Sequence, residues 1–149
     1  MRTSSTIVSY EITLPQRIYP HLDRLFSIFG RSVEKFIDRF WNESTLELLN
    51  QKGHACSILQ KIVQKPQDLP SRVFRNILEL TGEILRSQIE RKKLFDAFME
   101  HPCLVLYNER KIAERLNTST WFALNVKRLV SKLVRKGEKR DYFSLVKPN

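Results

Sequence analysis

The hydrophobic and polar residues of this chain follow two different periods. In residues 6–14, Val8, Tyr10, Ile12 and Leu14 alternate with polar residues, and this period of two predicts a half-buried β-strand that Pro15 closes. Residues 141–147 (DYFSLVK) predict a second strand near the other end. Because an isolated pair of strands is only marginally stable in water, we expect this β element to rest on helices or to be completed by strands beyond residue 149.

Between these two segments, apolar residues recur every three to four positions, which predicts a helical region over residues 17–136. Its first part, from Ile18 to Trp41, forms either two amphipathic helices or one long helix broken at Gly30. A short helix over about residues 55–64 precedes a proline-bounded linker at residues 65–70. We therefore expect a mainly α fold, in which a helical insertion is flanked by two terminal β-strands.

The longest predicted helix follows this linker. Ser71 is a favourable N-cap after Pro70, and the helical pattern then continues for 29 residues until Pro102 ends it. A helix around residues 109–116, a turn at residues 117–119 and a helix over residues 120–136 come next, and Gly137 ends the last of these. The expected buried side of the long helix comprises Phe74, Ile77, Leu78, Thr81, Ile84, Leu85, Gln88, Phe95 and Met99.

The composition agrees with one helical domain over residues 1–149. A chain of 149 residues that is 42% hydrophobic can fill one core of ordinary size, and its four glycines and six prolines are few for an all-β protein. Neither a membrane-spanning stretch nor the apolar region of a signal peptide is visible, so we expect a cytoplasmic protein without membrane contact.

Positive charge is concentrated near the C-terminal end of the sequence. Residues 109–149 contain eleven Lys or Arg against four Asp or Glu, so they hold +7 of the formal net charge of +10. In a helix over residues 120–136, the cations lie opposite the apolar face, with Trp121 and Asn125 beside them. Cations beside an aromatic ring suit a polyanion with stackable bases, whereas the alternative is an ordinary solvated surface. The cations are Arg128, Lys132, Arg135 and Lys136, followed by Lys139 and Arg140.

The long helix carries a second basic row on its polar side. Arg72, Arg75, Arg86 and Lys93 fall within about 60° of one another on a helical projection, so the row could follow a phosphate backbone. Glu79 and Glu90 interleave with it and could neutralise it through intrahelical pairs. The sequence leaves these two interpretations open.

Candidate catalytic and metal-binding residues are sparse. Glu34 and Asp38 lie one helical turn apart among basic residues, a spacing that favours weak surface ion pairs over acid–base chemistry. His101 and Cys103 have no second pair of ligands nearby in the sequence. The common nucleotide-binding and hydrolase motifs are missing as well. We therefore expect no catalytic residue, no metal and no cofactor.

Residues 109–147 also resemble a winged helix-turn-helix. The helix at 109–116, the turn and the helix at 120–136 would form its helical part, and the basic run at 136–140 followed by YFSLV would form its wing. This alternative predicts a DNA-binding regulator that reads a major groove and forms a homodimer. A third alternative is a purely structural or protein-interaction helical domain.

The segment LPSRVFRNILELTGEILRSQIERKK, residues 69–93, resembles a helical segment near the N-terminus of the TnpB family of transposon-encoded RNA-guided nucleases. Arg72, Arg75, Asn76, the run at 82–88 and Arg91 carry this similarity. In that family, helices inserted into a small wedge-like β-barrel form a recognition lobe, an order that matches the predicted strand, helical insertion and strand.

The resemblance implies an RNA-binding or RNA–DNA-duplex-binding region, for which base pairing supplies the sequence specificity. The family's nuclease has three separated acidic residues in a RuvC-like fold and a zinc-binding CxxC pair, and these 149 residues contain neither. The resemblance therefore implies a part that grips nucleic acid without cutting it, with a downstream nuclease domain as a partner.

Overall fold

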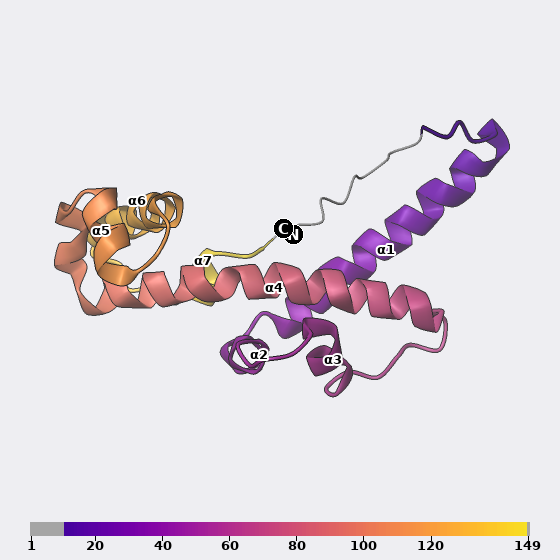
Figure 1. The fold of residues 1–149 in the computed structure, drawn as a ribbon, viewed down its shortest axis with the longest axis horizontal. Coiled ribbons are helices and arrows are strands. Elements are labelled where there is room, and N and C mark those ends of the chain that lie inside the picture. The colour runs from indigo at the N-terminus through magenta and orange to yellow at the C-terminus, as the bar shows by residue number, and fades with distance from the viewer. Residues whose placement is uncertain (1–10, 149) are drawn as a thin grey trace, which may run out of the picture.

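The computed structural model describes residues 11–148, and all regular structure in this range is helical. A short 3-10 helix, η1, precedes the first long helix, and a second one, η2, follows the longest helix (Figure 1). The elements are η1 (Gln16–Ile18), α1 (Tyr19–Phe40), α2 (Glu43–Leu49), α3 (Ala55–Gln60), α4 (Ser71–Glu100), η2 (Pro102–Leu106), α5 (Glu109–Leu116), α6 (Thr120–Lys136) and α7 (Tyr142–Leu145).

Helix α4 is the central helix of the fold, and both hydrophobic clusters include its residues. It has 30 residues, so it is about 45 Å long at the usual helical rise. One hydrophobic cluster lies along its N-terminal part, where α1, α2 and α3 pack, and a second lies along its C-terminal part, where η2, α5, α6 and α7 pack (Figure 1). Trp41 packs against both clusters and so joins the two halves.

Helix α1 runs without interruption through Gly30, which settles the question of one helix or two. A glycine inside a helix costs only about 1 kcal/mol relative to alanine, and the packing of the C-terminal half of α1 offsets this cost. Val33, Phe36, Ile37 and Phe40 are buried there. The N-terminal half projects away from the rest of the protein (Figure 1), and Phe26 is 66% exposed.

Gly82 allows α3 and α4 to approach closely. A Cβ atom on residue 82 would lie 2.5 Å from the Cβ of Ala55, closer than two such atoms can come. Gly82 is buried at this contact, and Cys56 also approaches α4, its Sγ lying 3.6 Å from the carbonyl oxygen of Arg75.

The predicted linker at residues 65–70 is part of an irregular connection between α3 and α4. Helix α3 ends at Gln60, earlier than the predicted residue 64.

The predicted β element is wrong wherever the structure describes it. Residues 141–147 were predicted as a strand, but they contain the short helix α7, in which the amide of Val146 donates to the carbonyl of Tyr142 at 3.0 Å. Tyr142 is 1% exposed, and its hydroxyl donates to Oε1 of Gln88 on α4. Tyr142, Leu145 and Val146 all pack on the second hydrophobic cluster, so they share one side instead of alternating between two.

The other predicted strand, at residues 6–14, lies mostly outside the described residues. Residues 11–15 have no regular structure. A strand needs a neighbour to pair its backbone groups, and none of the residues described in the structure forms a strand. The fold of the described chain is therefore helical, not helices flanked by a β element.

Candidate nucleic-acid interface

Helix α6 has the boundaries that the sequence predicts, because local signals fix both ends. Ser119 is its N-cap, and its Oγ accepts a hydrogen bond from the amide of Phe122 at 3.2 Å. Gly137 ends it in the left-handed conformation with φ 65°, which a glycine adopts without strain. The prediction of a helix over residues 120–136 is confirmed.

The two faces of α6 are separated as predicted. Ala123, Val126, Val130 and Leu133 are buried in the second hydrophobic cluster. On a helical projection, the predicted cations are centred roughly 160° away from these four side chains, so they face solvent. Arg128, Lys132, Arg135 and Lys136 are all exposed.

Most of this charge is not neutralised by the protein itself. Within the described part of the chain, Arg128, Lys132 and Lys136 take part in no ion pair. Nε of Arg135 donates to the carbonyl of Ser131 at 3.3 Å, which leaves the charge of its guanidinium uncompensated. We call the half-buried Asn125 and the exposed Trp121, Arg128, Lys132, Arg135 and Lys136 together the α6 surface.

Trp121 lies on this surface and not in the core. Its side chain is 66% exposed, and its ring meets the Phe122 ring edge-on with the centroids 5.0 Å apart. This contact holds the indole against α6 while a large part of the ring faces solvent. Nδ2 of Asn125 donates to the carbonyl of Trp121 at 2.8 Å, so one amide hydrogen is already used within the helix.

The basic run after α6 is only partly free. Lys139 is exposed, whereas Nε of Arg140 lies 3.3 Å from Oε2 of Glu138. This run was also predicted to lead into the second strand of a wing, and α7 replaces that strand. The wing of the winged helix-turn-helix alternative is therefore wrong.

The helix-turn-helix part of that alternative is present. Asn108 caps α5 by accepting from the amide of Lys111, and Asn117 ends α5 in the left-handed conformation with φ 49°. The amide of Thr118 donates to the carbonyl of Ala113 at 3.0 Å, which fixes the turn into α6. Helices α5 and α6 pack on each other, and α6 packs on the C-terminal part of α4.

Two cations that the sequence did not single out hold the segment before α5 in place. Nζ of Lys127 donates to the carbonyl of Tyr107 at 2.6 Å, and the guanidinium of Arg115 lies 5.6 Å from the centroid of the Tyr107 ring. Both attach the end of η2 to the α5–α6 pair. No sequence pattern marks these contacts, since Tyr107 lies in a loop.

The predicted basic row of α4 divides into different roles. Arg72 and Arg75 are exposed near the start of the helix. Lys93 pairs with Glu90 at 3.1 Å, as the interleaved glutamates suggested. Arg86 instead donates to three backbone carbonyls at and after the end of α2, those of Leu49, Gln51 and Gly53, at 2.9, 3.1 and 2.6 Å. Arg86 thus has a structural role, and the row does not form one continuous surface.

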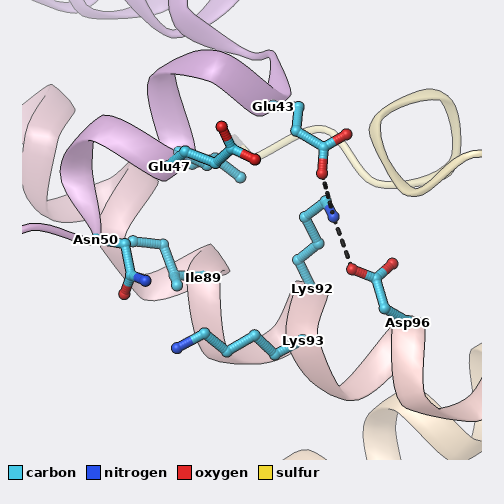
Figure 2. A pocket seen from close by; sticks show the side chains of 8 residues that line it. Glu43, Glu47, Asn50, Ile89, Lys92, Lys93 and Asp96 are labelled. Carbon is cyan, nitrogen blue, oxygen red and sulfur yellow. Dashed lines mark hydrogen bonds and ion pairs between the residues drawn. The ribbon is translucent and has the colours of Figure 1, made fainter.

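A small cavity lies between α2 and α4, close to Lys93 (Figure 2). Lys92 reaches across it and bridges Oε1 of Glu43 at 2.9 Å and Oδ2 of Asp96 at 2.7 Å. Burial lowers the pKa of Lys92, but its hydrogen bonds and charge interactions with Asp96 and Glu43 outweigh this effect, so the pKa is raised. The cavity has a volume of about 100 Å³. The ion pairs of Lys92 with Glu43 and Asp96 attach α2 to α4 beside it.

The acidic and thiol residues considered from the sequence are not gathered into a site. Asp38 forms a surface ion pair at 2.6 Å, but its partner is Lys147 from the far end of the chain and not one of the neighbouring cations of its own helix. His101 and Cys103 are both exposed at the junction of α4 and η2. No group of three or more His, Cys, Asp or Glu suited to a metal ion occurs among residues 11–148.

In the part of the chain that the structure describes, no helix is both long and apolar enough to cross a membrane. Comparisons of this chain with protein-family models, with curated proteins and with solved structures gave no match.

Proposed function

We propose that the α6 surface binds nucleic acid through contacts with the phosphate backbone. The observation that carries the proposal is the set of four exposed cations on the side of α6 opposite its buried face, beside an exposed tryptophan. Phosphate contacts of this kind supply most of the sequence-independent affinity of nucleic-acid-binding proteins. The net charge of +10 adds long-range attraction.

Trp121 adds a contact that a phosphate-only surface does not have. An exposed aromatic ring can stack on an unpaired base, and such stacking contributes about 1–3 kcal/mol per base irrespective of sequence. Arg128 lies two helical turns further along on the same side of α6, so a strand whose base stacks on Trp121 can place a phosphate near this cation. The proposed ligand is RNA or an RNA–DNA duplex with accessible bases at its end.

The resemblance to the TnpB family remains a proposal about origin. Its support is the segment 69–93, whose quoted residues lie on α4. A reading frame adjacent to this gene that encodes three separated RuvC-type acidic residues would support the relation to a nuclease. Because the described residues contain no strand, the proposal does not include the wedge-like β-barrel of that family.

A second candidate is sequence-specific DNA binding by the α5–α6 helix-turn-helix. The observed turn at residues 117–119 and the exposed N-terminal end of α6 favour it. In this case Asn125 and Arg128 would contact base edges in a major groove, where a good pair discriminates by about 1–3 kcal/mol. Phosphate binding does not predict such discrimination.

The test is a salt titration of RNA and DNA binding by the parent chain and the variant Lys132→Ala/Arg135→Ala. Each phosphate contact contributes about 0.7 to 0.9 to the slope of log affinity against log salt, so the variant should flatten the slope by about one to two units for all sequences alike. The control is Lys52→Ala/Lys61→Ala, which removes the same charge from exposed positions outside the α6 surface. An unchanged slope and affinity in the α6 variant would contradict the proposal.

A further inference from the structure

Helix α1 also carries a row of cations, which the sequence pattern alone did not single out. Arg24, Arg31, Lys35 and Arg39 fall within about 80° of one another on a helical projection. All four are exposed, and none forms an ion pair with another described residue. Asp38, an acidic residue beside the row, is already paired with Lys147.

A groove lies beside the C-terminal half of this row. Its volume is about 480 Å³, and it is formed by α1 and by the connection that enters α4. Arg31, Lys35 and Arg39 line it from α1, together with Phe36, and Asp68 and Leu69 line it from the connection. The groove thus combines a cationic wall, an apolar floor and one carboxylate.

These three features match the chemistry of a nucleotide. A phosphate can lie against the cations, and the face of a base can lie on the apolar floor beside Phe36 and Leu69. The Asp68 carboxylate can accept a hydrogen bond from an exocyclic amino group, such as the N4 amine of cytosine. A volume of about 480 Å³ lies within the usual range of roughly 300–1,000 Å³ for small-ligand sites.

We propose that this groove binds one unpaired nucleotide of a single-stranded nucleic acid, with its phosphate on Arg31, Lys35 and Arg39 and its base on the apolar floor. The inference rests on the proposed function for its ligand class. A paired base has its faces covered by stacking and its edge covered by its partner, so the groove selects single-stranded over duplex segments.

The groove and the α6 surface are separate sites. The groove lies at Leu69, just before α4 begins, whereas α6 packs on the C-terminal part of α4, and the helix between them is about 45 Å long. Substitutions in one site therefore leave the other intact. A strand long enough to reach both gains affinity from simultaneous binding.

The experiment measures binding of a fluorescent 12-nucleotide oligocytidine RNA and of a duplex of the same length by fluorescence anisotropy at several salt concentrations. The groove variant is Arg31→Ala/Lys35→Ala, and the matched control with the same loss of charge is Lys52→Ala/Lys61→Ala. The groove variant should lower the affinity for the single strand on the order of tenfold at low salt and flatten its salt slope by about one unit or more. The control and the duplex should change much less.

Asp68→Asn provides a second readout that a purely electrostatic effect would not give. It should reduce the preference for oligocytidine over oligouridine, because the neutral amide oxygen of asparagine is a weaker acceptor for the cytosine amine than the charged carboxylate. Equal losses for the groove variant and its control, or for single strand and duplex, would overturn the inference. So would complete displacement of oligocytidine by polyglutamate of equal length, since that result would indicate a general anion site for acidic peptides.

The α6 variant Lys132→Ala/Arg135→Ala separates this inference from the proposed function. Weaker binding in the α6 variant and unchanged binding in the groove variant would overturn the inference alone. The reverse result would overturn the proposed function and support the groove. Thermal melting of each variant shows whether it is folded, and Arg31 and Lys35 were chosen because both are exposed.

Discussion

The indole Nε1 of Trp41 donates a hydrogen bond to the backbone carbonyl of Phe143 at 2.9 Å, across 102 positions of the sequence. The two rings also meet edge-on, with their centroids 5.0 Å apart. Trp41 directly follows α1, and Phe143 lies in α7, so this contact joins the N-terminal and C-terminal parts of the chain beside α4. Several properties of the protein depend on this junction.

Tyr142→Ala should destabilise the protein strongly. Tyr142 is 1% exposed and contacts Trp41 and Phe95, so its removal leaves a cavity where the two halves of the fold meet. Loss of a buried aromatic side chain costs about 3–5 kcal/mol, and urea denaturation followed by circular dichroism measures this change. Ser144→Ala, at an exposed position of the same short helix, is the control and should change stability little. Equal stabilities would mean that α7 does not contribute to the folded state.

Tyr142 should also make the protein sensitive to alkaline pH. Burial raises the pKa of its hydroxyl from 10.0 to about 12. The folded state therefore holds the proton more tightly than the unfolded state, so the stabilisation is fully present below pH 10 and is lost as the pH rises to about 12. Tyr142→Phe removes this titration. The fall in unfolding free energy between pH 9 and pH 11.5 should be about 1–2 kcal/mol smaller in this variant than in the parent; identical pH profiles would contradict the expectation.

Arg86→Ala should destabilise the α2–α3 connection without direct loss of a nucleic-acid contact. It removes three charge-assisted hydrogen bonds and leaves the backbone carbonyls of Leu49, Gln51 and Gly53 without this donor. The expected cost is about 1–3 kcal/mol, measured by thermal or urea unfolding. Arg86→Lys should restore little, because an ammonium cannot reproduce the fork of the guanidinium. Arg72→Ala is the matched control on the same helix and should stay within about 0.5 kcal/mol.

Two glycine substitutions should have opposite effects. Gly82→Ala places a methyl group against Ala55, so it should destabilise the protein although alanine favours the helix. Gly30→Ala meets no atom within 4 Å in the middle of α1 and should stabilise the protein by about 0.5–1 kcal/mol. Melting temperatures of the two variants and the parent test both signs. A stabilising Gly82→Ala would mean that α3 can move away from α4 without cost.

The comparison of sequence and structure separates local from non-local information. Gly137 predicted the end of α6, and the N-caps Asn108 and Ser119 lie directly before α5 and α6, because a helix is capped by residues next to it in the sequence. The exposed charge of α6 was equally predictable. The burial pattern of α6 follows from the spacing of apolar residues within this one helix.

Residues 141–147 show why the β element failed. The apolar residues of this segment stand in two adjacent pairs, Tyr142–Phe143 and Leu145–Val146. Such a short apolar run is compatible with a strand or a helix, and the choice depends on what surrounds the segment. Tyr142, Phe143 and Val146 lie against α4 and the end of α1, so a single helical turn buries Tyr142 and partly buries the other two without a partner strand. The residues of the segment itself do not predict that Trp41 and Gln88 are its neighbours in the fold.

The sequence by itself determined that this protein is mainly helical, where α5 and α6 begin and end, and that α6 presents cations and Trp121 opposite an apolar face. Each of these properties depends on residues within a few helical turns of one another. Only the tertiary structure decided that Arg86 binds three carbonyls, that Gly82 is a contact point and that the cations of α1 border a groove at Leu69. These properties depend on which distant segments pack together, and packing is set by the combined fit of many side chains and not by any one local pattern.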